Sequence, residues 1–237
     1  GVNMSVSGSS FINNTASGGG AIYTTGGTSA NMGVSGSSFI NNTANSGGAI
    51  FNNDGVNMSV SGSSFINNTA SGSGGAIYDN VGVNMSVSGS SFINNTAGSN
   101  GGAISDNGGI NMSVSDSSFI NNTADHGGGA INSNGVNMSV SGSNFTNNTA
   151  TTSGGAITNS GENLSVSGSI LINNTASIGG GIMNEDSTKN NTISINDNVI
   201  VNNTDSTGSS DIVIYDNVTI GNNNIVGNVT NNGDLSV

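Results

Sequence analysis

The sequence predicts an all-β protein, a parallel β-helix (β-solenoid) with about nine coils of about 27 residues each. A fixed-period repeat, apolar residues at alternate positions and a shortage of helix-forming residues support this prediction. The chain reads GVNMSVSGSSFINNTASGGGAIY from position 1, and almost the same from position 55. Repeat periods between about 20 and 50 residues are typical of solenoids and arrays. We therefore expect one elongated unit over residues 1–237.

The period follows from the aromatic residue of FINNT, whose successive copies are 26 to 28 residues apart. This residue is Phe11, Phe39, Phe65, Phe92, Phe119 and Phe145. The segments NMSV and GGAI recur with the same spacing. The repeats are regular over 1–184, and the coils over 185–237 are degenerate, with Leu171, Ile200 and Ile225 at the aromatic position.

Three short apolar segments in each coil are the expected strands. In VNMSVSG, Val2, Met4 and Val6 alternate with polar residues, which is typical of a strand with one buried face. SSFI and GAIY are two further apolar runs bounded by Gly, Ser and Asn. With only three Leu and with 39 Gly, the chain lacks the residues of helical or leucine-rich repeats. Coils should therefore stack in register, about 4.7–4.9 Å apart.

Comparison of the coils predicts which side chains face the core. Positions that stay Met, Val, Phe or Ile must fit the same slot in every coil, so we expect them to be buried. The predicted core columns include Met58, Val60, Phe65, Ile77, Phe92 and Phe119. The residue after the Ile of GGAI varies from Tyr23 to Asn132, so this column is expected to face outward.

The Asn pair of NNT and the glycines of GGAI are interpreted as turn residues. Asn tolerates a left-handed backbone, and stacked Asn side chains can form hydrogen bonds along a column. We expect at least one Asn of each pair to form such a turn ladder. Glycine suits a tight corner or a positive φ. No strand–helix pattern surrounds GGAI, so it does not indicate a phosphate-binding loop.

The motifs FINN and GGAI fit the alternating patterns F-x-x-N and G-G-A-[IL]. The chain thereby resembles the repeats of chlamydial polymorphic membrane proteins and the adhesin-like surface proteins of methanogenic archaea. The resemblance is strong over 1–184 and weaker beyond. It implies a right-handed coil, secretion, display at the cell surface, and a role in adhesion or envelope architecture rather than catalysis.

The charge balance excludes several partners. The chain has one Lys+Arg and 13 Asp+Glu, for a formal net charge of −12. Nucleic-acid binding depends on basic contacts with phosphates, so we expect no nucleic-acid partner. Anionic membranes are unfavourable for the same reason. No apolar run approaches the length of a membrane span, so membrane insertion of this segment is not expected.

A polysaccharide-active enzyme is a weaker alternative. Acid–base cleavage of a glycosidic bond needs clustered carboxylates, and an anionic sugar needs a cation. The chain has one Lys, Lys189, one His, His126, and no Arg. Glu185 and Asp186 are its one pair of adjacent acidic residues. We therefore expect no catalytic residues, no enzyme activity and no cofactor.

Calcium is the one metal ion that the sequence suggests, weakly. Asp54, Asp79 and Asp106 precede GVN or its variants in consecutive coils, and stacking could bring them together. Calcium prefers such oxygen ligands. The alternative interpretation is that Asp simply suits a turn.

Glycosylation sequons, N-x-[ST], occur at two places in the repeat. In the first strand segment they are Asn3, Asn57, Asn84, Asn111, Asn137 and Asn163. After the Phe they include Asn13, Asn67 and Asn94. Asn3 precedes Met4 in the pleat and should face outward, so some of these sites are expected to carry glycans. Bare polar surface is the alternative.

These features predict a non-catalytic extracellular or cell-surface segment of an adhesin or stalk. Its partners would be other surface proteins or glycans, or copies of itself end to end. A self-assembling filament or cell-envelope subunit is the main alternative, and an ice- or crystal-binding solenoid is a weaker one. Unpaired strand edges invite pairing, so we expect the first coil to be covered by more of its own chain or by a neighbour.

Overall fold

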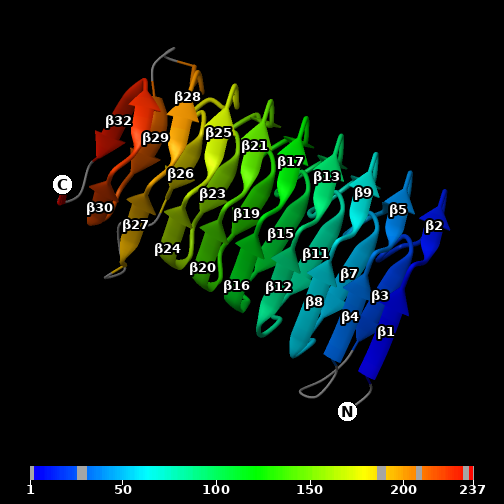
Figure 1. Ribbon diagram of the computed structural model, residues 1–237. Helices are drawn as coiled ribbons and strands as arrows, with labels where there is room; N and C mark the ends of the chain where they lie inside the picture. The colour runs from blue at the N-terminus through cyan, green and yellow to red at the C-terminus, as the bar shows by residue number, and fades with distance from the viewer. Residues whose placement is uncertain (1–2, 26–30, 186–190, 207–209, 232–234, 237) are drawn as a thin grey trace.

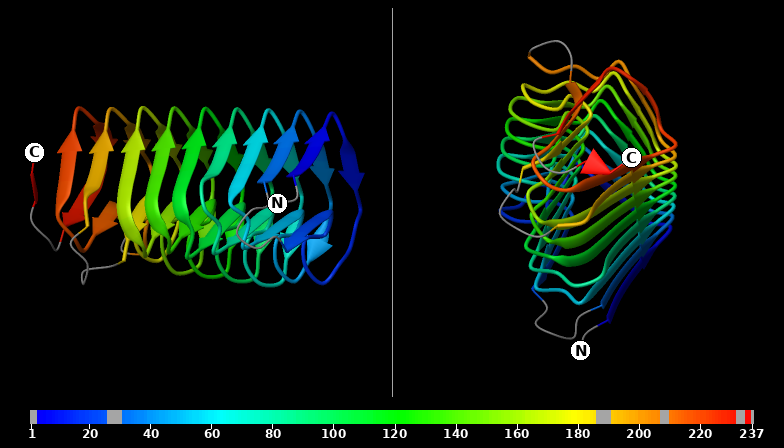
Figure 2. Two further views of the ribbon diagram at one scale, coloured as in Figure 1. Left: turned by 90° about the horizontal axis from the view of Figure 1, so that it is seen from below. Right: turned by 90° about the vertical axis from the view of Figure 1, so that its left-hand side faces the viewer.

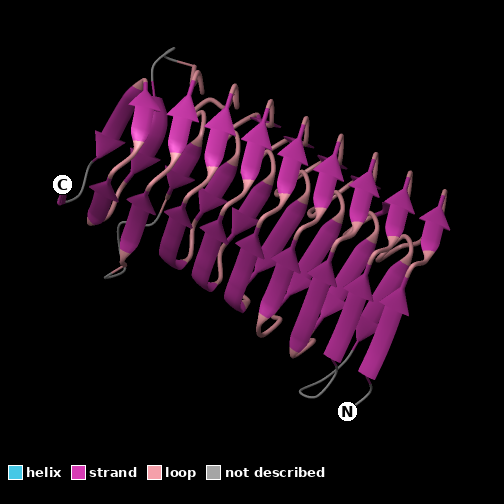
Figure 3. Cartoon of the chain, viewed as in Figure 1, coloured by secondary structure: helices cyan, strands magenta, loops and turns pink. Residues whose placement is uncertain are grey.

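The computed structural model describes residues 3–25, 31–185, 191–206, 210–231 and 235–236. Their regular structure consists of β-strands joined by turns (Figure 3). The strands wind into an elongated coil with the two chain ends at opposite ends of its long axis (Figure 1). Lys189 and Asp186 lie outside the described residues.

Three long parallel sheets run along the coil. Sheet 1 has the order β1 (Asn3–Ser7), β4 (Asn31–Ser35), β8 (Asn57–Ser61), β12 (Met85–Ser88), β16 (Ile110–Ser115), β20 (Val136–Ser141), β24 (Glu162–Ser167), β27 (Ile193–Asn196), β30 (Val218–Gly221) and β33 (Leu235–Ser236). Sheet 2 has the order β2 (Ser10–Ile12), β5 (Ser38–Ile40), β9 (Ser64–Ile66), β13 (Ser91–Ile93), β17 (Ser118–Ile120), β21 (Asn144–Thr146), β25 (Ile170–Ile172), β28 (Val199–Val201) and β31 (Asn224–Val226).

Sheet 3 and a short fourth sheet complete the coil. Sheet 3 has the order β3 (Ile22–Thr25), β7 (Ile50–Asn53), β11 (Ile77–Asn80), β15 (Ile104–Asn107), β19 (Ile131–Ser133), β23 (Ile157–Asn159), β26 (Ile182–Asn184), β29 (Ser210–Ile214) and β32 (Asn228–Asn231). The short sheet contains β6 (Thr43–Ala44), β10 (Thr69–Ala70), β14 (Thr96–Ala97), β18 (Thr123–Ala124) and β22 (Thr149–Ala150).

Each strand pairs in parallel with its equivalent in the next coil, so like residues stack on like. Phe92, for example, pairs with Phe65 on one side and with Phe119 on the other. The predicted parallel β-solenoid is confirmed, and its nine-stranded sheets agree with the roughly nine coils expected. Strands beyond residue 184 continue the same sheets. The right-handed coil stays a prediction, consistent with the hand of parallel crossovers in general.

The predicted core columns are buried. The Phe rings from Phe39 to Phe145 have no exposed surface. Consecutive rings from Phe11 to Phe145 lie 4.7–4.9 Å apart between centroids, with planes within 6° of parallel. This separation is set by the strand spacing, and it lies within the range that stacked aromatic pairs prefer. Met58, Val60 and Ile77 belong to the same core.

The two Asn residues of each NNT have different roles, as Asn94 and Asn95 illustrate. Asn94 has a φ of 54° and is exposed, so it supplies the left-handed turn. Asn95 is fully buried, and its Nδ2 donates to Asn122 Oδ1 at 2.9 Å and to the Phe65 carbonyl at 3.0 Å. The same pattern repeats from coil to coil, which confirms the turn ladder. Buried amides satisfied in this way avoid the cost of unpaired polar groups.

The glycine pair of GGAI makes a corner that a larger residue cannot make. Gly74 has a φ of +69°, and a Cβ on Gly75 would lie 2.0 Å from the carbonyl oxygen of Gly102. The close approach of stacked backbones therefore requires glycine here, and the turn interpretation is confirmed.

We predict that Phe92→Ala destabilises the solenoid by about 3–5 kcal/mol, because it leaves a cavity between Phe65 and Phe119. Urea unfolding and hydrogen exchange would measure the loss, which may be localised to the neighbouring coils because solenoid repeats contact only their neighbours. Ser91→Ala, which alters the adjacent outward side chain, is the matched control. A loss below about 1 kcal/mol for Phe92→Ala would contradict the stacked core.

Candidate functional site

The proposed alignment of three aspartates is wrong. Strand register pairs Asp79 with Asp106 on one side and with Asn52 on the other. The Asp54 amide donates to the Asn80 carbonyl and thus lies beyond the end of β7, so Asp54 does not join the column. Distance from GVN does not give an aspartate's position in its strand, because the turns before GVN differ between coils.

Asp79 and Asp106 instead lie in a buried polar column on the inner face of sheet 3. Asn52 Nδ2 donates to Asp79 Oδ1 at 2.6 Å, and Ser133 Oγ donates to Asp106 Oδ2 at 2.8 Å. Burial, opposed by the Asn52 hydrogen bond and reinforced by the Asp106 charge, raises the pKa of Asp79 to about 7. Within the described residues, no group of three His, Cys, Asp or Glu side chains is placed to hold a metal ion. Calcium binding therefore has no cluster of carboxylates to support it.

The raised pKa of Asp79 predicts a pH-dependent stability. The folded state keeps the proton up to about pH 7, whereas the unfolded carboxyl loses it near pH 3.9. The stabilising contribution of Asp79 to the free energy of unfolding is therefore complete below about pH 4 and is lost as the pH rises through about 7. Asp79→Asn, which places an amide in a column that already contains Asn52, should raise stability at pH 8 by about 1–3 kcal/mol.

Thermal unfolding of both proteins between about pH 4 and about pH 8 would test this expectation, because this range spans the folded and unfolded pKa values of Asp79. Asp54→Asn removes the same formal charge from an exposed position and is the control. Equal pH dependence of the wild type and Asp79→Asn would show that Asp79 does not carry the effect.

The sequons form two exposed columns with different amide environments. In sheet 1, Asn84 Nδ2 donates to Asn57 Oδ1, and Asn111 Nδ2 donates to Asn84 Oδ1, both at 3.0 Å. The same ladder includes Asn3, Asn137 and Asn163. In the turn column, the amides of Asn13, Asn67 and Asn94 form no side-chain hydrogen bond within the described part of the chain. The turn amides are therefore the more accessible of the two sets.

Glycosylation stays a prediction, and the structure ranks its sites. We expect higher occupancy at Asn13, Asn67 and Asn94 than in the sheet 1 ladder, because the turn Nδ2 atoms are free to react. Neighbouring coils are about 4.8 Å apart, too close for a glycan on every coil. Glycopeptide mass spectrometry of native material would measure occupancy, with protein from a host lacking N-glycosylation as the control. Higher occupancy in the sheet 1 ladder would contradict the ranking.

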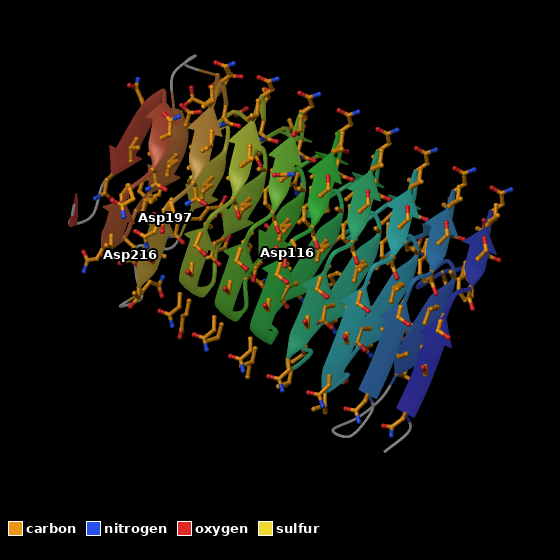
Figure 4. The ribbon with its side chains drawn as sticks, viewed as in Figure 1. Asp116, Asp197 and Asp216 are labelled. Carbon is orange, nitrogen blue, oxygen red and sulfur yellow. The ribbon has the colours of Figure 1, made fainter. Side chains whose placement is uncertain are left out.

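The acidic residues outside this column are dispersed. Figure 4 shows Asp116 near the middle of the solenoid, whereas Asp197 and Asp216 lie towards its C-terminal end. Asp116 and Asp197 have φ values of 48° and 57° and occupy the turn position that is glycine in most coils. They are turn residues and do not converge on a site.

The column that follows the Ile of GGAI changes character along the chain. Tyr23 is 53% exposed, and the rings of Tyr23, Phe51 and Tyr78 contact one another with centroids 5.0 Å apart. In the next coils, Ser105 and Asn132 take this position and are buried, as are Thr158 and Met183. The prediction that the whole column is exposed is therefore wrong, because the loop before GGAI covers its second half.

A polar hollow opens where small residues replace the aromatic side chains. This polar trench has a volume of about 440 Å³. Its lining consists of Asn100, His126, Gly127, Asn132, Asn134, Thr152, Ser153, Ser160 and Glu185. These residues come from four successive coils, from the loops before GGAI on one side and from the end of sheet 3 on the other.

Hydrogen bonds hold both walls of the polar trench. Asn100 Oδ1 accepts from the Gly127 amide at 3.0 Å, and Thr158 Oγ1 donates to the Ser153 carbonyl at 2.8 Å. Glu185 Oε1 accepts from Ser153 Oγ at 2.5 Å. Its Oε2 accepts from Ser160 Oγ at 2.7 Å, so the carboxylate bridges the two walls. These hydrogen bonds fix the positions of both walls.

Sequence comparison missed the polar trench. In the sequence, His126 is only the single His of the chain, Glu185 is half of an acidic pair, and Asn132 belongs to a column expected to face outward. The usable signal was the change from Tyr23, Phe51 and Tyr78 to smaller residues. Its meaning depends on the covering loop, which only the structure shows.

The protein is therefore a parallel β-solenoid with stacked apolar and Asn columns inside and polar columns outside. The model of the Chlamydia polymorphic membrane protein repeat matches this chain at residues 8–25, 62–80, 89–107, 116–134 and 142–160. Each match begins at the turn before a sheet 2 strand and ends at or just after a sheet 3 strand. The chain therefore carries this repeat, as the motifs FINN and GGAI predicted. The comparisons found no similar curated protein and no similar solved structure. The methanogen resemblance stays a prediction.

No helix among the described residues is long and apolar enough to cross a membrane. The polymorphic membrane protein repeats lie in the coiled part of the fold, where strands pair with one another.

Proposed function

We propose that this solenoid is an extracellular segment of a surface adhesin or stalk and acts without catalysis. The observation that supports this role is the regular outer surface, on which the same polar side chains recur in each coil. Ser59, Ser86 and Ser113 stand one above another on sheet 1, beside the exposed Asn57 ladder. The matched repeat supports a location at the cell surface.

Repeated columns suit weak, multivalent contacts. Each coil adds an equivalent set of groups about 4.8 Å further along the axis, which gives a rod on the order of 40 Å long. Contacts that are individually weak add through avidity when several are made together. The partners would be other surface proteins or glycans, and copies of this chain are the other candidate for an interaction along the axis.

The core explains why such a segment would persist outside a cell. The chain contains no Cys, and the buried Phe and Asn columns hold adjacent coils together. Both views in Figure 2 show the regular stacking of the coils along the axis. A uniform rod of this kind separates its ends while presenting a constant surface between them.

Surface display is testable on intact cells of the source organism. We expect antibodies raised against the folded segment to label unpermeabilised cells, and external protease to remove the label. An antibody against a cytoplasmic protein is the control for cell integrity. Labelling only after permeabilisation would overturn the surface assignment.

A further inference from the structure

The polar trench retains hydrogen-bonding groups that the fold does not use. Asn132 is 8% exposed, and its side-chain amide has no hydrogen-bond partner among the described residues. Asn100 uses its Oδ1 on the Gly127 amide and leaves Nδ2 free, and the Thr152 hydroxyl has no partner in the described structure. His126 Nδ1 lies 3.5 Å from Ser99 Oγ, and its Nε2 points to no described partner. No atom of the Asn132 amide is among the fully enclosed, unpaired polar atoms of the described residues, so the amide faces the trench and is available to a polar ligand.

The free groups include both donors and acceptors. Asn100 Nδ2 donates, and the Asn132 amide and the Thr152 hydroxyl can do both. The Glu185 carboxylate, whose oxygens already accept from Ser153 and Ser160, can accept further bonds through its remaining lone pairs. Sugar hydroxyls likewise donate and accept, so a saccharide can satisfy all of them together. The volume of about 440 Å³ falls in the range of small-ligand sites, about 300–1,000 Å³.

The dimensions favour a short chain of sugars. The lining residues span four coils, from Asn100 to Glu185, and so about 14 Å along the axis at one strand spacing per step. Its lining contains no Leu, Ile, Val, Met or aromatic hydrocarbon side chain that would select an apolar peptide side chain. Tyr78 stands in the same column as Asn132, two coils away.

Charge selects the kind of saccharide. Glu185 is the carboxylate in the trench, and the chain has a formal net charge of −12 with one Lys+Arg. An anionic sugar would meet repulsion without a compensating cation. One carboxylate also lacks the partner that glycosidic cleavage requires, so the arrangement suits binding rather than hydrolysis.

We propose that the polar trench binds a neutral oligosaccharide, with Asn132 at its floor and Glu185 accepting from ligand hydroxyls. This assigns a site and a ligand class to the adhesive role proposed above, and its biological meaning rests on that role. Binding in solution is nevertheless independent of cell location, so either test can fail while the other succeeds.

The test is a titration of the purified chain with neutral trisaccharides of glucose, mannose, xylose and N-acetylglucosamine, followed by calorimetry and saturation-transfer NMR. At least one should bind, and trigalacturonate should not. Asn132→Tyr should lower the affinity about tenfold or more, because the ring fills the trench as Tyr78 fills the same column in its own coil. Glu185→Gln should lower it several-fold without filling the trench.

Ser91→Ala alters an outward side chain of sheet 2, which is not part of the trench lining, and should leave the affinity unchanged. Circular dichroism and melting curves establish that each variant is folded, and Glu185→Gln provides the test if Asn132→Tyr does not fold. Absence of binding by every neutral trisaccharide would overturn the proposal. So would binding unaffected by both trench variants, stronger binding of trigalacturonate, or Glu185-dependent binding of calcium alone with no saccharide binding.

Discussion

The structure depends on one constraint, the in-register stacking of equivalent residues at a single strand spacing. Phe92 must fit between Phe65 and Phe119, and its ring therefore adopts the same orientation as theirs. An amide can both donate and accept, so Asn95 can bond to an identical neighbour in each direction. Only side chains that are compatible with a copy of themselves can fill an interior column. This explains why apolar residues and Asn occupy the core columns in coil after coil.

Asp79 and Asp106 show what happens when a column departs from that requirement. Two carboxylates in adjacent coils repel each other when both are ionised, and burial removes the water that would reduce the repulsion. Asn52 and Ser133 donate to the outer oxygens of the pair. A raised pKa at Asp79 relieves the remaining conflict, because the protonated acid is neutral. The column is stable as long as a proton is available, which links this part of the fold to pH.

The outer columns of sheet 1 recur from coil to coil, whereas the sheet 3 column beneath the covering loop varies. A column beneath the covering loop can change from Tyr78 to Asn132 without affecting the ladders inside. Smaller side chains leave space, and the loop residues His126 and Ser153 enclose it. The solenoid thus combines a repetitive core with a local hollow, and a difference of a few residues is enough to open that hollow in an otherwise uniform rod.

The sequence by itself determined the architecture, because every coil repeats the same pattern of apolar, Asn and Gly positions. Phe65 recurs with one spacing, so its burial and stacking could be predicted. A turn ladder of Asn could be predicted too, but only the structure shows that Asn68 is the buried member of its pair. The tertiary structure decided features that depend on the exact register or on contact between several coils. Asp54 could not be placed from its distance to GVN, since turn length shifts position relative to the strands. The polar trench was hidden for a related reason: Asn132 and Glu185 are far apart in sequence, and only stacking under the loop brings them to one hollow.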